Sequence, residues 1–483
     1  MDPVLPFPIN LPPEGSRRLL RALHEQLRAA ILDGRLQPGL QLPATRALAT
    51  AYGVSRNTAV AAYDLLLSEG YLVTRPRSGA YVADVLPQTR NRKGSTGDRA
   101  INRRLNAFWR APPAIMPASL RSTARFDFRL GVTDKRLFPF ELWRRLSARA
   151  LRAFAGQATT YGRPQGRYAL RDAIAKHASF ARAVACQADD IVVMAGSQQA
   201  FDLLARILVT RGRTVVAIEN PGYPALHAAL AAVGARIVLV PVDGEGMIVD
   251  KLPRDAHVIC VTPSHQFPLG VAMSMRRRAA LLEFAQARDA VVVEDDYDGE
   301  FRFGGRPLDA LQSLDRTESV FYIGTFSKSL FPGIRLSFVV APPWARRALV
   351  AAKLCADMHC AVIEQDTLAA FISEGHMARH LRKMREVYGA RLRVLLTCLR
   401  NDFSRWLEPI PSIAGLHVAA FATSSMDMDA IAERARELDV GVYPLRDYYF
   451  RGRAKPGLVF GYGAIEERDI VEGLSRLRRA YPK

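Results

Sequence analysis

The sequence predicts a multidomain protein, with an α+β winged helix-turn-helix domain at the N-terminus and an α/β domain after it. Residues 17–84 are dense in helical periodicity and end in two short strand-like runs. From about residue 123, β-branched runs alternate with amphipathic segments, which is typical of βα units around a mostly parallel sheet. Residues 86–122 are rich in Arg, Pro, Ser and Gly without a sustained apolar period. We therefore expect domains at 14–84 and 123–483, a linker at 85–122, and a small C-terminal subdomain from about residue 345.

Composition sets the broad class. The chain has 483 residues, of which 49% are apolar, so it has ample material for two or three packed cores. Its five cysteines form no CxxC pair and no apolar run is long enough to cross a bilayer, which predicts a soluble, cytoplasmic protein with free thiols. The net charge of +20 favours polyanionic partners, although charge alone does not identify nucleic acid.

The N-terminal domain begins with helical segments. The run LHEQLRAAILDG has apolar residues at helical spacing and stops at Gly34. Ala44 to Tyr52 is a second helix, GVS is a tight turn, and Ser55 is the N-cap of a third helix that runs to about Ser68. Two helices joined by such a turn form a helix-turn-helix.

The run YLVTRPRSGAYV then predicts two short strands joined by a Pro, Arg, Ser and Gly turn, the wing of a winged helix. The start of the third helix would reach base edges and phosphates, and arginines nearby would add charge beside the grooves. The DNA-contacting candidates are Arg46, Ser55, Arg56, Asn57, Thr58, Arg75, Arg77 and Gly79. The alternative is a small helical bundle with solvated arginines.

The framework LPATRALA, GVSRNT, EGYL and SG.YV resembles the GntR family of winged-helix regulators over residues 17–84. Two positions depart from the family pattern: Ala44 stands where Ser is usual and Arg77 where Gly is usual. These departures concern base contacts rather than the fold.

The second domain supplies six predicted strands, which are the runs IVVMAGS, TVVAIEN, ARIVLVPV, HVICVTP, AVVVEDD and SVFYIGT. Lys328 follows the last of them in GTFSKS, and alone it would be an ordinary surface lysine. The run VVVEDDYDGEF ends another strand, and strand alternation puts Asp295 and Tyr297 on one face and Asp296 on the other. A buried carboxylate needs a cationic or N–H partner, and a protonated pyridine ring would supply it.

Pyridoxal 5'-phosphate requires a lysine amine, an acid at the ring nitrogen, a donor at the phenolic oxygen, and cations with N–H groups for the phosphate. The sequence offers Lys328, Asp295, Tyr297 and Arg335 for these four tasks. The run AGSQQAFDLL adds Ser197 and Gln198 at a helix N-terminus, which suits a phosphate, and Tyr223 in ENPGYPA suits stacking on the ring.

Residues 123–483 thus resemble a fold-type I aminotransferase, and the whole chain resembles the MocR/GabR family of transcription regulators. The resemblance implies that Lys328 forms the internal aldimine and that Thr325, Ser327, Ser197, Gln198 and Arg335 surround the phosphate. It also implies a homodimer, because Tyr161 of YGRPQG would approach the phosphate of the neighbouring subunit. Arg446 of YPLRDYY matches the position expected to hold an effector carboxylate, or it is an ordinary surface arginine. His265 either lines the pocket or is merely hydrogen-bonded.

Two functions stay open. One is a regulator that binds double-stranded DNA and senses pyridoxal phosphate or an amine; the other is an aminotransferase that carries a DNA-binding domain. Family aminotransferases usually have Asn where this chain has Phe267, and usually have Arg in the region of GLVFGYG, where this chain has none. Both departures favour the regulator, with at most a weak transamination half-reaction. His376 and His380 lie at i and i+4 but lack the glutamate of HExxH, so we expect no metal site.

Overall fold

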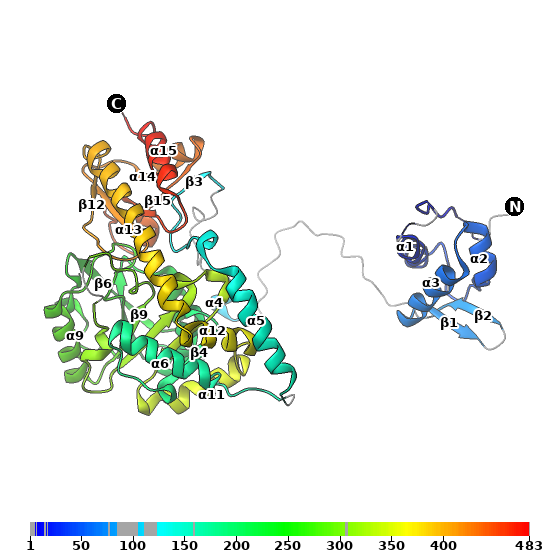
Figure 1. The fold of residues 1–483 in the computed structure, drawn as a ribbon, viewed down its shortest axis with the longest axis horizontal. Coiled ribbons are helices and arrows are strands. Elements are labelled where there is room, and N and C mark those ends of the chain that lie inside the picture. The colour runs from blue at the N-terminus through cyan, green and yellow to red at the C-terminus, as the bar shows by residue number, and fades with distance from the viewer. Residues whose placement is uncertain are drawn as a thin grey trace. The chain divides into compact units, whose positions relative to one another are not determined.

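The computed structural model describes residues 5, 7–13, 16, 18–75, 78–84, 105–110, 123–157, 160–304 and 308–482. It divides into two compact units, within residues 1–102 and 103–483 (Figure 1). Of the predicted linker, residues 105–110 are described and contain the short helix α4 (Ala107–Arg110). The predicted wing residue Arg77 lies outside the described residues.

The N-terminal unit is a winged helix. Its elements are α1 (Leu19–Leu32), α2 (Thr45–Tyr52), α3 (Arg56–Ser68) and the antiparallel strands β1 (Leu72–Arg75) and β2 (Gly79–Val82). Gly53 ends α2 with a φ of 63°, a conformation that glycine adopts without steric cost. Ser55 caps α3, because its hydroxyl accepts a 3.0 Å hydrogen bond from the Thr58 amide. The predicted helix-turn-helix and wing are therefore present.

The apolar faces of these helices meet in one core. Leu23 and Leu27 of α1, Leu48 of α2 and Leu66 of α3 are all buried in it. Every residue of this core cluster lies between positions 5 and 82. The N-terminal unit therefore has a hydrophobic core of its own, as an independent domain requires.

The C-terminal unit is built on an eight-stranded mixed sheet with the order β4-β11-β10-β9-β8-β5-β6-β7. The strands are β4 (Ile191–Met194), β5 (Val215–Asn220), β6 (Arg236–Asp243), β7 (Gly246–Met247), β8 (Val258–Val261), β9 (Val291–Asp296), β10 (Val320–Thr325) and β11 (Ser337–Val340). Neighbours from β10 through β9, β8 and β5 to β6 are parallel, as predicted, and β11 and β7 pair antiparallel. All six predicted strands are present.

Helices cover both faces of this sheet, so its strands are apolar on both sides. On one face lie α7 (Ser197–Leu208), α8 (Pro224–Ala232) and α11 (Arg346–Asp357). On the other lie α6 (Tyr168–Arg182), α9 (Met275–Arg288) and α12 (Val362–Ser373). Strand β4 illustrates the alternation of side chains between the two faces. Val192 packs in the core beneath α7, α8 and α11, and Val193 packs in the core on the opposite face, with α6 and α12. Helix α5 (Phe140–Ala155) packs against α12.

A second sheet lies in the C-terminal part, with the order β12-β13-β16-β15. Its strands are β12 (Leu407–Pro409), β13 (His417–Ala422), β16 (Gly457–Gly461) and β15 (Tyr443–Pro444), and its helices are α13 (His376–Asp402), α14 (Met428–Glu437) and α15 (Glu467–Arg478). Strand β3 (Phe126–Asp127) pairs with β14 (Val440–Gly441). The described segment that begins at residue 123 is therefore joined by strand pairing to the C-terminal part of the unit.

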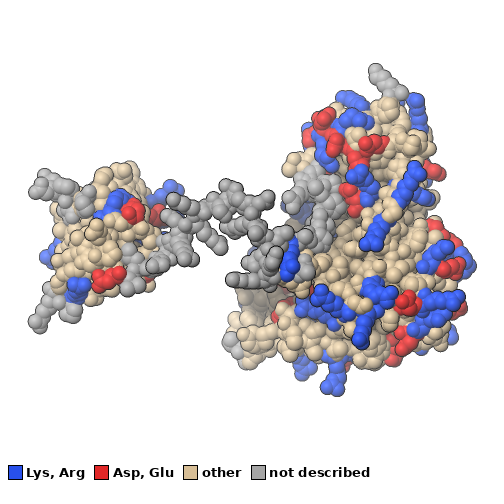
Figure 2. All heavy atoms as spheres, turned by 180° about the vertical axis from the view of Figure 1, so that it is seen from behind, with Lys and Arg blue, Asp and Glu red and all other residues tan. Residues whose placement is uncertain are grey.

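Lys and Arg side chains are distributed over the face of the C-terminal unit seen in Figure 2, with Asp and Glu side chains between them. All five cysteines carry free thiols, as expected. Among the helices of the described segments, none combines the length and the apolar character that crossing a bilayer demands.

Candidate functional site

The N-terminal unit exposes the predicted DNA-contacting side chains. Arg56 and Asn57 are exposed in the first turn of α3, and Arg46 is exposed on α2. Ser55 and Thr58 face each other across the cap, with 2.8 Å between their hydroxyl oxygens. The N-terminus of α3 therefore presents exposed polar groups beside the positive end of a helix dipole, which favours phosphate.

The wing carries the remaining described candidates. Arg75 and Gly79 form the pair of facing residues nearest the turn between β1 and β2. The guanidinium of Arg75 lies 4.4 Å from the centre of the Tyr81 ring, and Asp84 is 3.9 Å away. Gln41 donates to the carbonyl of Ser78 and thereby fixes the base of the turn. Arg75 is thus held on a rigid aromatic support at the end of the wing.

The C-terminal unit contains a cavity of about 460 Å³ at the carboxyl ends of β9 and β10, a usual size for a small-molecule site. Nine of the predicted site residues line it. They are Ser197, Gln198, Tyr223, Asp295, Tyr297, Thr325, Ser327, Lys328 and Arg335. These residues come from five separate stretches of the sequence, and the parallel strands bring them together because strand ends share one edge of the sheet.

Lys328 and Asp295 contribute a buried amine and a buried carboxyl group to the cavity wall. Lys328 lies on the short helix α10 (Phe326–Ser329), and its Nζ donates a 2.6 Å hydrogen bond to the carbonyl of Gly131. Burial lowers the pKa of Lys328. Asp295 is only 9% exposed, and its Oδ1 accepts no hydrogen bond from the residues that the structure describes. Burial together with Asp296 and Asp298 raises its pKa to about 8. An acid with an unsatisfied buried oxygen indicates a missing cationic or N–H partner.

Asp296 points to the other side of β9, as strand alternation predicts. It accepts hydrogen bonds from Arg182 Nε at 2.6 Å and from the Tyr322 hydroxyl at 2.7 Å. This buried ion pair anchors α6 to the sheet. Asp296 is therefore paired with Arg182 inside the protein, whereas Asp295 lines the cavity.

An oxyanion cradle lies between α7 and α10. Arg335 donates to the carbonyl of Ala195 at 2.8 Å, and Thr325 accepts from the amide of Ser327 at 3.2 Å. Gly196 has a φ of 91°, and a Cβ there would lie 2.2 Å from Arg335 Nη2. Only glycine admits the guanidinium so close to the N-terminus of α7, where Ser197 begins the helix. The arrangement suits a phosphate group.

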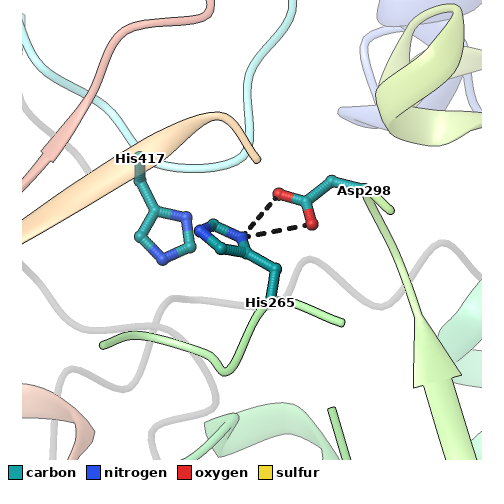
Figure 3. A group of neighbouring side chains, drawn as sticks. All are labelled: His265, Asp298 and His417. Atoms are coloured by element: carbon teal, nitrogen blue, oxygen red, sulfur yellow. Dashed lines mark hydrogen bonds and ion pairs between the residues drawn. The ribbon is translucent and has the colours of Figure 1, made fainter. Parts of the chain in front are cut away.

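Tyr297 is held by a buried polar cluster. Its hydroxyl donates to the carbonyl of His265 at 2.8 Å. His265 Nδ1 lies 3.1 Å from a carboxylate oxygen of Asp298, and the ring centres of His265 and His417 are 4.6 Å apart (Figure 3). The ligand-type atoms of His265, Asp298 and His417 all lie within 4.8 Å of one another. A metal ion bound there would have to replace the contact between His265 and Asp298.

Three predicted residues do not line the cavity. His265 is the buried, hydrogen-bonded histidine just described. Tyr161 is 77% exposed, with its ring 6.2 Å from that of His359. Arg446 lies on a surface turn, with a side chain that is 64% exposed and an Nη1 that is 2.5 Å from Asp429. Of the metal candidates that we discounted, His376 contacts Arg379 and His380 is buried against Phe138.

Sequence reasoning missed three polar residues at the cavity. Arg129 and His417 line it, as does Asp298, and Tyr448 and Phe267 contribute aromatic walls. His417 opens the apolar strand β13 and resembles a core residue in the sequence, whereas Arg129 follows a strand of only two residues. Of these three residues, only Asp298 has a signal in the sequence, because it lies in EDDYDGEF, three residues after the predicted site residue Asp295.

Two protein families match this chain, one in each unit. Residues 19–82 match the family "Bacterial regulatory proteins, gntR family", and residues 129–451 match "Aminotransferase class I and II". The probable rhizopine catabolism regulatory protein MocR of Rhizobium meliloti is 36% identical over 95% of this chain and 93% of its own length. The HTH-type transcriptional regulator TauR of Rhodobacter capsulatus is 33% identical over 97% of this chain and 98% of its own length.

Solved structures resemble the C-terminal unit. The kynurenine aminotransferase of Pyrococcus horikoshii, crystallised in complex with PMP, has a TM-score of 0.69 and 28% identity over 75% of this chain and 91% of its own. The two regulators are therefore similar to this chain over nearly its whole length, whereas this enzyme is similar over three quarters of it. The chain belongs to the MocR/GabR family of transcription regulators, in which a GntR-type winged helix precedes an aminotransferase-like domain.

Proposed function

We propose that this regulator binds pyridoxal 5'-phosphate in the cavity of its C-terminal unit and responds there to the cofactor itself or to an amine. Lys328 would hold the cofactor covalently, Asp295 would pair with the ring nitrogen, and the cradle of Arg335, Ser197 and Thr325 would hold the phosphate. Bound pyridoxal phosphate supplies a carbonyl carbon that exchanges between amines. Tyr223 would stack on the ring, and Ser327 and Gln198 would complete the phosphate site.

The observation that carries this proposal is the buried Oδ1 of Asp295, which has no hydrogen-bond partner among the described residues and lies in a cavity that Lys328 also lines. Burial raises the pKa of Asp295 to about 8, so its ionised form is costly, and a cationic ring nitrogen would offset that cost. The glycine-lined approach of Arg335 to α7 supplies a phosphate site at the opposite end. The residues present therefore fit pyridoxal phosphate at both ends of the molecule.

A regulatory role, rather than catalytic turnover, is supported by the walls of the cavity. Phe267 stands edge-on to Tyr223 at 5.5 Å and to Tyr297 at 6.2 Å, where family aminotransferases usually have an asparagine amide. An aromatic ring cannot donate a hydrogen bond to the ring oxygen. The Tyr297 hydroxyl, which could do so, donates instead to His265.

Double-stranded DNA would be the macromolecular partner, read by α3 and the wing, and a homodimer would present two winged helices to paired half-sites. A DNA-binding regulator acts where the chromosome lies, so we place the protein in the cytoplasm. Tyr161, exposed at the surface of the C-terminal unit, would serve the phosphate of the neighbouring subunit.

The experiment uses the full-length protein, so that DNA binding by one unit and cofactor uptake by the other are measured on the same chain. Double-stranded oligonucleotides that bind the protein are selected from a random pool, and their affinity is measured with and without pyridoxal phosphate. We expect a visible absorption band in the loaded protein and an operator affinity that changes with loading or with an added amine. A protein that neither takes up the cofactor nor selects DNA would contradict the proposal.

A further inference from the structure

A second, smaller cavity shares Asp295 with the large one. Its volume is about 20 Å³, and its polar walls include Glu219 of β5, Thr262 and Asp295. Phe201 and Tyr223 line both cavities. A polar site of about 10 to 15 Å³ or more holds a water molecule when two or more polar groups face it, so the small cavity has room for one water molecule.

Glu219 is a buried acid whose two oxygens differ in their contacts. Its Oε2 accepts hydrogen bonds from Thr262 Oγ1 at 2.6 Å and from Gln266 Nε2 at 3.3 Å. The residue is 6% exposed, and its Oε1 has no hydrogen-bond partner within the described part of the chain. Because buried polar atoms are nearly always hydrogen-bonded, an unpartnered carboxyl oxygen beside a polar cavity indicates a ligand there.

Asp295 can serve both cavities at once. A carboxylate has about four acceptor positions, so Asp295 can pair with a ring nitrogen in the large cavity and also accept a hydrogen bond in the small one. Strand β8 lies between β5 and β9 in the sheet, which puts the backbones of Glu219 and Asp295 roughly 10 Å apart. Two acidic side chains and one water molecule can bridge that span.

The electrostatics of the pair favour one proton over none. Burial raises the pKa of Glu219 to about 7. Burial also raises the pKa of Asp295 to about 8; Asp296, Asp298 and Glu219 add to that increase, and Lys328 opposes it. Two neighbouring carboxyl groups that share a buried site do not both ionise readily.

The other ionisable groups around the pair do not compete for this proton. The protic groups are Cys260, Tyr223 and Tyr297, and burial raises the pKa of each, so each stays neutral near pH 7.5. The charge of Arg335 acts on Tyr223 in the opposite direction to burial. Asp296 is paired with Arg182, and Asp298 lies 3.1 Å from His265.

We propose that Glu219 and Asp295 hold one proton between them through a water molecule in the small cavity, and that Glu219 receives the proton that Asp295 gives up when a cationic ring pairs with it. Asp295 passes its proton to the water, and the water passes one of its own to Glu219 Oε1, so no proton leaves the protein. Glu219 is then a positioning residue, because it acts through Asp295. The inference rests on the proposed function, since bound pyridoxal phosphate supplies the cation.

The experiment counts the protons that the full-length protein exchanges with solvent when it binds pyridoxal phosphate. Calorimetric titrations in two buffers with different enthalpies of ionisation give this number, at about pH 7.5 and again at about pH 5.5. The variants are Glu219→Gln and Glu219→Asp. Glutamine keeps an oxygen that can accept from Thr262 but cannot take up a proton, so it preserves the structural role of Glu219.

Glu294→Gln is the matched control. Burial raises the pKa of Glu294 to about 7, as it does for Glu219. Its carboxylate accepts from the amides of Leu311 and Gln312, and it belongs to the lining of neither cavity. The control therefore removes an equally buried acid that has no water-mediated contact with the cofactor partner Asp295.

At about pH 7.5, between the two pKa values, Glu219→Gln should release roughly half a proton to one proton more per chain than wild type. Glu219→Asp should give an intermediate count, and Glu294→Gln should match wild type. At about pH 5.5 Glu219 already carries a proton before binding, so wild type should release one as well and the difference should vanish. The proton exchange of the cofactor itself cancels in each comparison.

Equal proton counts at about pH 7.5 in wild type and Glu219→Gln would overturn the inference, as would an equal change in Glu294→Gln. If Glu219→Gln fails to fold, infrared difference spectra of wild type decide. Transfer within the pair replaces one protonated carboxyl band by another, whereas a loss without a gain means that the proton leaves the pair. A wild-type protein with no visible band would instead defeat the proposed function, and the inference with it.

Discussion

Lys328 Nζ donates a 2.6 Å hydrogen bond to the carbonyl oxygen of Gly131, which joins the end of α10 to the segment after β3. This contact holds the amine at the cavity wall. Because burial lowers its pKa, Lys328 loses its proton more readily than a surface lysine does. An unprotonated amine is the form that attacks a carbonyl carbon.

The first prediction concerns this lysine. Lys328→Ala should abolish the visible absorption of protein loaded with pyridoxal phosphate and any link that borohydride can fix. The cradle around Arg335 should still bind the phosphate, so inorganic phosphate or the cofactor should continue to raise the melting temperature. An unchanged visible band in Lys328→Ala would mean that another amine is attached.

The second prediction is a pH dependence of the unloaded protein. The pKa of Asp295 is raised from 3.8 to about 8, so the stability linked to its protonated form is complete below pH 4 and is lost as pH rises through about 8. Glu219 and Glu294, each with a pKa of about 7, act in the same direction. Melting temperature should therefore fall between pH 5 and 8.5 in the unloaded protein.

Asp295→Asn provides the control, since an amide stays neutral across this range. The unloaded variant should lose less stability over the same pH interval, and it should bind pyridoxal phosphate more weakly. Loaded wild type should lose less than unloaded wild type, because the cationic ring nitrogen pairs with the carboxylate. Equal pH slopes for unloaded wild type and Asp295→Asn would contradict the raised pKa of Asp295.

The sequence predicted the strand elements and most of the cavity because both follow from short-range patterns. Period-two alternation placed Asp295 in the cavity and Asp296 against Arg182, and the cap at Ser55 located the start of α3. Residues at the ends of parallel strands meet at one edge whatever the details of the loops. Nine of the residues predicted for the site therefore line one cavity.

The remaining residues depend on how the C-terminal sheet packs against the large one, which no local pattern encodes. Arg446 lies just after a two-residue strand, and nothing in YPLRDYY fixes the direction of its side chain. His417 resembles a core residue because its neighbours are apolar, and Arg129 follows a strand, β3, that pairs with β14 more than 300 residues later. The proposed role of Tyr161 depends on a second chain, which the sequence of one chain cannot position.

The third prediction concerns DNA. Arg56→Ala and Arg75→Ala should each weaken operator binding and reduce the salt dependence of the affinity by about one counterion per lost phosphate contact. Arg21→Ala is the control, because Arg21 is exposed on α1 and paired with Glu25. Affinity is measured at several salt concentrations. If Arg21→Ala weakens binding as much as Arg56→Ala, then α3 does not present the recognition surface.

The fourth prediction is a homodimer with shared sites. Wild type should sediment as a dimer at micromolar concentration, and Tyr161→Phe should bind the cofactor more weakly while staying dimeric. Mixed dimers of Lys328→Ala and Tyr161→Phe chains decide which site Tyr161 serves. If Tyr161 acts across the interface, each mixed dimer regains one intact site. If it acts within its own chain, no intact site forms and the mixture binds no better than its parents.

The last prediction is that the two units are coupled. A ligand shifts the DNA-binding equilibrium only if it binds two conformations of the protein with different affinity, and a coupling of about 1 to 3 kcal/mol changes operator affinity roughly 5- to 150-fold. We expect a change of this size between two of three states: unloaded, loaded with pyridoxal phosphate, and loaded with an added amine. A change on loading identifies the cofactor as the signal, and a change only on adding the amine identifies the amine. Either change should be lost in Lys328→Ala. Equal operator affinity in all three states, together with transamination at about one turnover per second or faster, would indicate an enzyme rather than a sensor.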